Sequence, residues 1–218
     1  MKWTNKISDE LLDYLTPYSN WFFNQDLSEL DTITKNPGRM AGYTLESACG
    51  SDYLKMILEK DNKHIGFPEH TMSIDLQGDE KTPQLHRDKC REMGNKVTAF
   101  LGSKNQAVNV YYPENGFMSW HNNWNAHGYN ILLSYSQTGN GFFRYRDPIT
   151  KEVITMPDKV GWSCKVGYFG RGREPDKVFY HCAGSLEKRL TLGFIVPHLE
   201  IWRNMIEDIS GEDASSFT

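Results

Sequence analysis

Cysteine is scarce in this chain of 218 residues, and it follows no pattern typical of a disulfide framework or a zinc site. The four cysteines are Cys49, Cys90, Cys164 and Cys182, and no two of them form a CxxC pair. Small secreted domains carry dense, regularly spaced cysteines, and structural zinc sites use closely spaced pairs. We therefore expect reduced thiols in an intracellular protein.

Basic residues and long apolar runs are also lacking. There are 24 Lys and Arg against 28 Asp and Glu, which gives a formal net charge of -4 and does not favour nucleic acid as a partner. No stretch approaches the roughly 20 apolar residues of a membrane-spanning helix. The beginning of the chain, MKWTNKISDELL, lacks the apolar core of a signal peptide. We predict a soluble cytoplasmic protein without a membrane partner.

The composition is sufficient for a large hydrophobic core. Hydrophobic residues make up 39% of the chain and aromatic residues 13%, and no internal repeat is visible. A chain of this length and composition is typical of one domain, here 1–218. We divide it into a mostly helical supporting region at 1–104, a core at 105–197, and a C-terminal helix with a tail at 198–218.

Helical signals dominate the first 104 residues. Ser8 is a suitable N-cap for a helix that we expect to end at Pro17, because proline has no amide hydrogen to donate. Two further helices are predicted, at 44–60 and at 83–101, the latter from apolar residues spaced three and four apart. A last amphipathic helix is predicted at 199–209, followed by a frayed tail.

After residue 104 the pattern changes to short apolar runs separated by turn sequences such as PENG, TGNG and DPITK. Strands are predicted at 106–113, 117–121, 129–136, 141–146, 151–156, 161–168, 177–182 and 188–196. One further short strand is expected within HTMSIDL, at 70–76. The fold class predicted is α+β, mainly β: a double-stranded β-helix, or jelly roll, with supporting N-terminal helices and a short C-terminal helix.

Two histidines and an arginine lie on these predicted strands. His121 ends one strand, and His181 and Arg189 lie on the last two. Neutral imidazole is a common ligand for iron, zinc, copper and nickel, and non-haem iron oxygenases hold the metal with two histidines and one carboxylate. Arg189 shares a strand face with Thr191. An inward arginine is costly unless it meets an anion, and its guanidinium fork suits a carboxylate.

Asn109 and Tyr111 form a second polar pair. They lie two residues apart in VNVYYP, so both side chains should point to the same face of one strand. An amide and a phenol can both donate hydrogen bonds to a carboxylate or a keto oxygen.

Taken together, these residues resemble the Fe(II)/2-oxoglutarate-dependent oxygenase superfamily. N-x-Y followed by H-x-D is similar to its AlkB-type branch, the His–Arg spacing to its prolyl-hydroxylase branch, and WHNNWNAHGYN with GFFRYRDP to small oxygenases of phage genomes. The resemblance covers roughly 105–197. It implies Fe(II) and 2-oxoglutarate as cofactor and cosubstrate, and C–H hydroxylation as the reaction. It implies that the metal is bound by His121, Asn123 and His181. It also implies that the cosubstrate's far carboxylate is bound by Arg189, Thr191, Tyr111 and Asn109.

Asn123 departs from this family pattern, which has aspartate at that position. A neutral amide oxygen binds iron more weakly than a carboxylate does. Three interpretations are open: Asn123 is a neutral ligand, the position is left vacant for an exchangeable ligand, or catalysis has been lost and the fold kept. His127 and Asn125 are alternative ligands in the adjacent turn.

For the substrate, we predict a peptidyl or small-molecule C–H bond. A nucleobase is the second interpretation, because aromatic side chains near His121 can stack on a base. A non-catalytic, cupin-like binding module is the third. The predicted substrate contacts are Trp120, Trp124, Arg144 and Arg146. Arg144 and Arg146 share a strand face, and pairing with Asp147 and Asp158 is the alternative role for them.

Overall fold

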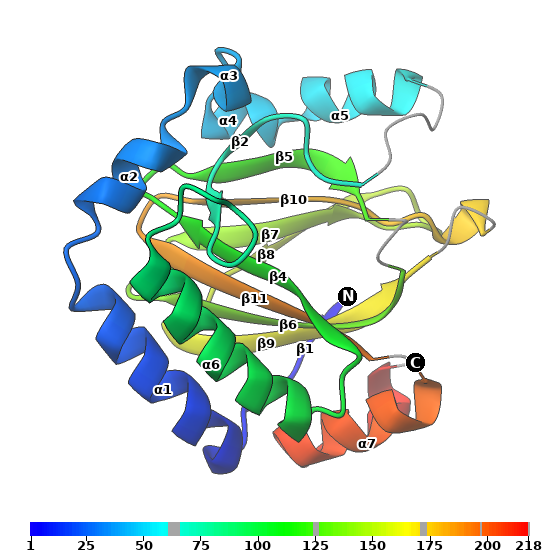
Figure 1. Cartoon of the computed structure of the whole chain (residues 1–218). Helices are drawn as coiled ribbons and strands as arrows, with labels where there is room; N and C mark the ends of the chain where they lie inside the picture. The colour runs from blue at the N-terminus through cyan, green and yellow to red at the C-terminus, as the bar shows by residue number, and fades with distance from the viewer. Residues whose placement is uncertain (61–65, 124–126, 171–173, 197, 218) are drawn as a thin grey trace.

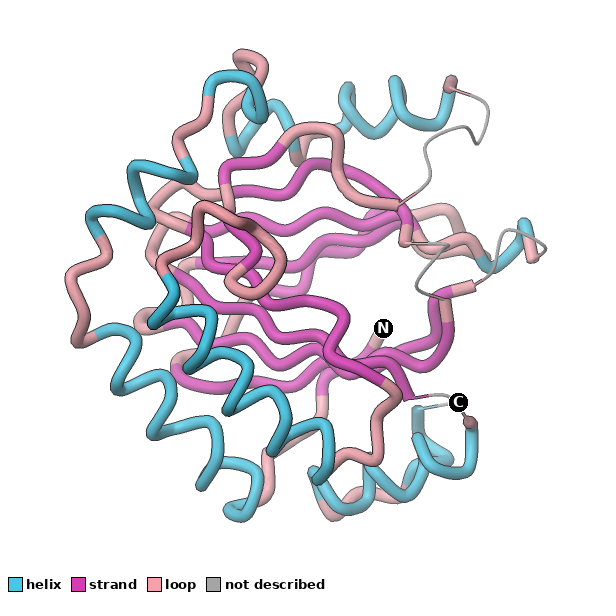
Figure 2. The backbone as a smooth tube through the Cα atoms, in the orientation of Figure 1, coloured by secondary structure: helices cyan, strands magenta, loops and turns pink. Residues whose placement is uncertain are grey.

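In the computed structural model, which describes residues 1–60, 66–123, 127–170, 174–196 and 198–217, two antiparallel sheets face each other. The larger sheet has the strand order β1-β9-β6-β11-β4-β3 and the smaller has β2-β5-β10-β7-β8. Figure 2 shows the two layers of strands with helices outside them. The strands are β1 (Lys2–Trp3), β2 (Thr71–Met72), β3 (Ile74–Asp75), β4 (Asn105–Tyr112), β5 (Phe117–Asn122), β6 (Gly128–Ser136), β7 (Gly141–Arg146), β8 (Val153–Pro157), β9 (Gly161–Phe169), β10 (Tyr180–Ser185) and β11 (Arg189–Val196). The predicted α+β jelly-roll fold class is confirmed.

Helices cover the outer faces of both sheets (Figure 1). Apolar side chains of α1, α6 and α7 pack with the outward residues of the larger sheet in one core, and α4 and α5 pack in the same way on the smaller sheet. A third apolar cluster lies between the sheets. The helices are α1 (Asp9–Phe23), α2 (Ser28–Thr34), α3 (Pro37–Met40), α4 (Leu45–Ala48), α5 (Ser51–Glu59), α6 (Gln84–Phe100) and α7 (Leu199–Ser210).

Three predictions about the helices and the C-terminal tail were wrong. Helix α1 continues through Pro17 to Phe23, because Pro17 lies on its exposed side and the following residues bury apolar side chains under the sheet. The single helix predicted at 44–60 is divided into α4 and α5, with Gly50 as the N-cap of α5. The tail forms a 3-10 turn at Ala214–Phe217, and Ala214 is buried in the core.

The strand predicted within 70–76 is divided between the two sheets. Strand β2 pairs with β5 of the smaller sheet, and β3, after one intervening residue, pairs with β4 of the larger sheet. Residues 71–75 therefore connect the sheets directly along one side. Among the described residues, no helix is both long enough and apolar enough to cross a membrane.

Candidate functional site: a cavity between the two sheets

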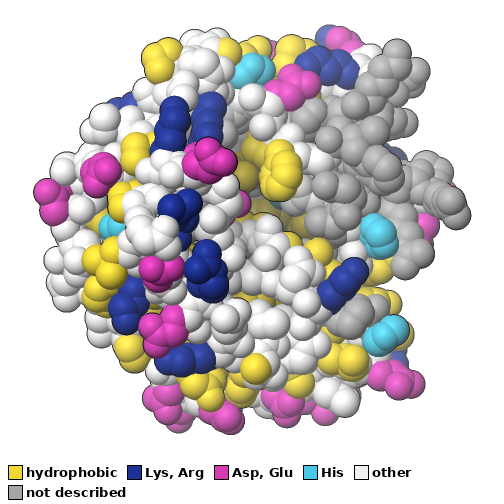
Figure 3. Space-filling model, in the orientation of Figure 1, with side chains coloured by type: hydrophobic (Ala, Val, Ile, Leu, Met, Phe, Trp, Pro, Cys, Tyr) yellow, Lys and Arg dark blue, Asp and Glu magenta, His cyan; other side chains and the backbone are white. Residues whose placement is uncertain are grey.

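A cavity of about 900 Å³ opens between the two sheets. Figure 3 shows a recess on this face of the molecule, with hydrophobic side chains inside it. Both sheets and the 71–75 connection contribute to its walls. Polar residues of the lining include Thr71, Ser73, Asp75, His121, Asn123, Asn130, Ser134, His181, Arg189 and Thr191. The lining also includes the charged residues Arg39, Asp79, Glu80 and Lys81 and apolar residues such as Leu132, Phe143 and Phe169. Two groups of its polar side chains are described in turn below.

His121 and His181 form the first polar group. They are directly opposed in register on the neighbouring antiparallel strands β5 and β10, and their ring centroids are 4.2 Å apart. A shift in register between His181 and Ala183 leaves one extra residue on β5, which is a β-bulge. Because of this bulge both Met118 and His121 line the cavity, although simple alternation would place them on opposite faces.

Both imidazoles are oriented by backbone carbonyls. Nδ1 of His121 lies 2.7 Å from the carbonyl oxygen of Ser119, and Nδ1 of His181 lies 3.0 Å from that of Phe179. Each Nδ1 therefore carries the proton and donates it, which leaves the lone pair on Nε2. Burial lowers the pKa of His181 to about 4, against the opposing effect of its backbone hydrogen bond. At neutral pH His181 is uncharged, the form that ligates metals.

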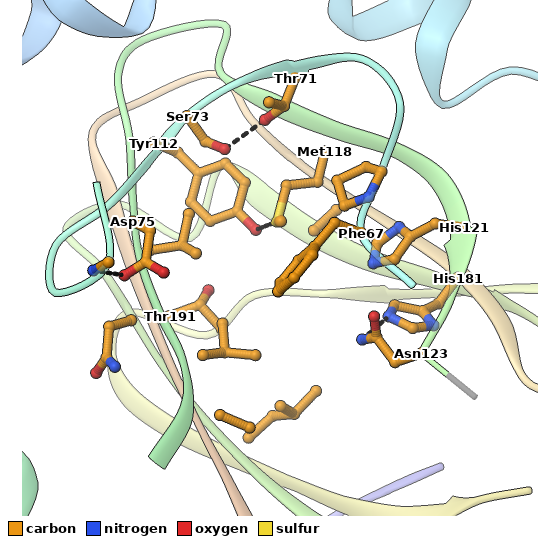
Figure 4. Close-up of a pocket in the computed structure, with 18 of the residues that line it drawn as sticks. Phe67, Thr71, Ser73, Asp75, Tyr112, Met118, His121, Asn123, His181 and Thr191 are labelled. Carbon is orange, nitrogen blue, oxygen red and sulfur yellow. Dashed lines mark hydrogen bonds between the residues drawn. The ribbon is translucent and has the colours of Figure 1, made fainter. Parts of the chain in front are cut away.

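Asn123 lies beside this pair (Figure 4). Its Nδ2 is 3.2 Å from Nε2 of His181, so the amide donates to the lone pair that a metal would use. Rotation of the amide about its last side-chain bond would present the oxygen instead. The donor set is thus two imidazole nitrogens and one amide oxygen. The described residues contain no group of three His, Cys, Asp or Glu side chains placed to hold a metal ion.

Arg189 is at the centre of the second polar group, and it is almost fully buried. Its Nε lies 2.5 Å from Oδ2 of Asp158 and its Nη2 lies 3.2 Å from Oδ1, which makes a two-point ion pair. Its Nη1 donates to Thr191 at 2.5 Å, and its Nη2 also donates to Ser134 at 3.2 Å. Thr191 and Ser134 both line the cavity. An inward, carboxylate-paired arginine is present, but its partner belongs to the protein itself.

Lys165 adds a second buried cation. Its Nζ lies 2.9 Å from Oδ1 of Asp158, and the side chains of both residues are fully buried. Burial raises the pKa of Asp158, but the charges of Arg189 and then of Lys165 outweigh this and lower it to about 2. The carboxylate is therefore ionised between two cations. The alternative that Asp158 pairs with Arg144 or Arg146 was wrong.

Asn109 and Tyr111 do not assist Arg189 as predicted. The Tyr111 hydroxyl donates to Asp31 at 2.5 Å in the core beneath the helices, and Oδ1 of Asn109 accepts from Cys90 of α6 at 3.4 Å. Asn109 borders the cavity, but its side-chain oxygen is directed to the helix layer. The prediction that the two share a face was right. The face was wrong, because alternation along β4 turns Val110 and Tyr112 inward.

The predicted substrate contacts also lie outside the cavity where the structure describes them. Trp120 is buried in the core beneath α4 and α5 and donates from Nε1 to the carbonyl oxygen of Gly50 at 3.1 Å. Arg144 donates to Thr155 and to the carbonyl oxygen of Cys49. Phe143 and Tyr145 face the interior of the barrel, so Arg144 and Arg146 face outward on β7. Trp124 and Asn125 lie outside the described residues, and His127 is not among the described residues that line the cavity.

Several residues of the cavity lining, or buried directly behind it, were not assigned these roles from the sequence. Ser134, Asp158 and Lys165 complete the Arg189 group, and a lysine within the apolar strand GWSCKVGYF was a signal that a buried carboxylate pairs with it. Phe67 projects into the cavity between Met118 and the histidines (Figure 4), although 73% of its surface remains exposed. No sequence pattern identified Phe67, because an isolated aromatic residue in a loop has no periodicity.

Comparison with known proteins gives limited information. No family model and no curated protein matches the chain. Among solved structures, a prolyl-4-hydroxylase from Pseudomonas putida is similar with a TM-score of 0.30 and 16% sequence identity, over 57% of this chain and 66% of the hydroxylase chain. A similarity of this degree carries no argument about function, so the functional argument below depends on the geometry of the site.

Proposed function

We propose that this protein is an Fe(II)- and 2-oxoglutarate-dependent oxygenase that hydroxylates a peptidyl or small-molecule C–H bond. The observation that carries the proposal is the cross-strand pair of His121 and His181, whose Nδ1 atoms are both fixed by backbone carbonyls. The pair lines the same cavity as Arg189. Two imidazoles and a cationic group in one cavity suit a metal and an anionic cosubstrate.

In this proposal the metal is held by His121 and His181, with the amide oxygen of Asn123 as a third, neutral donor. The carbonyls of Ser119 and Phe179 keep both rings in the ligating tautomer. Bound iron would supply the redox chemistry that activates oxygen. Arg189 and Thr191 would hold the cosubstrate's far carboxylate. Phe67, Met118 and Phe143 would form apolar walls that exclude water from the reacting atoms.

The proposal is tested by adding Fe(II) and 2-oxoglutarate to the protein without oxygen and recording the visible spectrum. A weak charge-transfer band is expected when a 2-oxo acid chelates iron in the site. Admission of oxygen should then produce succinate. Absence of both the band and succinate would reject the oxygenase function. It would leave the non-catalytic binding module, which the missing carboxylate ligand favours.

The Asn123→Asp variant tests the third ligand position. A carboxylate beside His121 and His181 should strengthen Mn(II) binding about tenfold or more, because it adds an anionic oxygen donor to a neutral set. Isothermal titration calorimetry with Mn(II) measures the change. Asn130→Asp is the matched control, since Asn130 also lines the cavity but donates to the carbonyl oxygen of Gly128. Equal Mn(II) affinity in Asn123→Asp and the unchanged protein would place position 123 outside the metal's ligands.

A further inference from the structure

Lys165 and Asp158 are buried behind the wall of the cavity. Lys165 lies on β9 of the larger sheet, and Asp158 follows β8 of the smaller sheet. Neither side chain has measurable exposure. Besides Asp158, the Lys165 ammonium lies 3.5 Å from Oγ of Ser134 and 4.0 Å from the ring centre of Trp3. The ion pair therefore joins the two sheets next to Arg189.

Asp158 contacts one particular edge of the Arg189 guanidinium. Its two carboxylate oxygens accept hydrogen bonds from Nε and Nη2, along the side of the guanidinium. The end of the fork, formed by Nη1 and Nη2, is directed to the hydroxyls of Thr191 and Ser134, which line the cavity. Asp158 thus fixes the orientation of the guanidinium and leaves the cavity edge in contact with neutral hydroxyl groups, which a ligand's carboxylate can replace as acceptors.

The charges of this cluster do not cancel. Arg189 and Lys165 each contribute one positive charge, and Asp158 contributes one negative charge. The charged side chains that act on Lys165 are Asp158 and Arg189, with the Cys164 thiol as a further titratable group. Lys159 also lies over the ring of Trp3, but its side chain is exposed to solvent. A buried net positive charge is unfavourable unless an anion is bound next to it.

We propose that Asp158 and Lys165 are positioning residues that convert Arg189 into a site for one ligand carboxylate. Asp158 holds the guanidinium with one edge toward the cavity, and Lys165 offsets the charge of Asp158, so the site retains one positive charge. The proposal rests on the proposed function, since it concerns the same cosubstrate. Beyond that function, we infer that the positive charge that attracts the cosubstrate depends on Lys165, although Lys165 does not contact the ligand.

A variant series tests the role of Lys165. Succinate is titrated into metal-free protein, and 2-oxoglutarate into Mn(II)-loaded protein, by calorimetry. Lys165→Met is expected to weaken both affinities about tenfold or more, because a positive charge near the ligand is lost at low local dielectric. Lys165→Arg should restore most of the affinity. Lys159→Met removes the same formal charge from the surface and should leave both affinities unchanged.

The pH dependence gives a test that needs no substitution. Burial is the main cause that lowers the pKa of Lys165 to about 8, with Asp158 opposing this effect and Arg189 adding to it. Above about pH 8 the lysine loses its proton and the cluster becomes neutral, so succinate affinity should fall in the unchanged protein. The same titration of Lys165→Met should show no such fall. The two titrations differ only if Lys165 supplies the charge.

The outcomes separate this proposal from the proposed function. Loss of succinate affinity in Lys165→Met without any turnover of 2-oxoglutarate would support the carboxylate site and reject the oxygenase. Turnover of 2-oxoglutarate with equal affinities and parallel pH profiles in Lys165→Met and the unchanged protein would support the oxygenase and overturn the role of Lys165. A Lys165→Met protein that fails to fold leaves the pH profile of the unchanged protein as the deciding measurement, and a flat profile through pH 8 overturns the proposal.

Discussion

Replacing His121 or His181 by alanine is expected to weaken Mn(II) binding about a hundredfold or more, and to abolish succinate formation from 2-oxoglutarate. Each substitution removes one of the two imidazole donors that the described residues bring together, and the described donor beside them is a neutral amide. Because oxygen chemistry in the proposed mechanism requires bound iron, activity should be lost together with the metal. Calorimetry with Mn(II), followed by a succinate assay with Fe(II), measures both effects.

His198→Ala is the matched control, since His198 is exposed at the start of α7 and is not among the described residues that line the cavity. It should bind Mn(II) like the unchanged protein. His127→Ala examines the alternative ligand in the turn after β5. Metal affinity that survives in His121→Ala but is lost in His127→Ala would show that the metal site has been assigned to the wrong histidine.

Removing Asp158 is expected to destabilise the protein by about 3–5 kcal/mol, because it leaves two buried cations without a counter-charge. Asp158 is the shared carboxylate of Arg189 and Lys165, and its side chain is fully buried. Asp158→Ala should therefore lower the urea midpoint strongly. Urea unfolding followed by circular dichroism measures the free energy of unfolding.

Two comparisons make this stability prediction specific. Glu92→Ala removes an exposed carboxylate that pairs with Lys96 on the surface of α6, and it should shift the urea midpoint far less than Asp158→Ala does, because solvent screens an exposed pair. The double variant Asp158→Ala with Lys165→Met removes one cation with the carboxylate, and it should recover part of the lost stability. A loss as small as that of Glu92→Ala would contradict the buried ion cluster.

Most of the fold was predictable because its signals are local. Strands with one buried face alternate in hydrophobicity, and turn residues separate them, so each of the eight predicted core strands is present. The errors occurred where distant packing overrides local preference. Pro17 is kept inside α1 because the residues after it are held by the core, and no local signal in the sequence reports that contact.

The site was predictable in its order along the chain and less so in its geometry. The histidines and Arg189 were identified, and the structure brings all three to one cavity. Their metal and cosubstrate roles stay predictions. The orientation of Tyr111 was wrong because a shift of one residue reverses the face of every side chain on a strand. The partnership of Asp158 with Arg189 joins residues 31 positions apart across two sheets, which no short motif reveals.

The connection at residues 71–75 limits how far the two sheets can move apart. One end of the segment is hydrogen-bonded to the smaller sheet and the other to the larger sheet, while Thr71, Ser73 and Asp75 line the cavity between them. Separation of the sheets on that side would require breaking backbone hydrogen bonds, which is costly in a packed interior. The backbone pairing therefore fixes the width of the cavity on that side. A compound thicker than this width would have to break those hydrogen bonds to enter, even if its charged groups matched those of the lining.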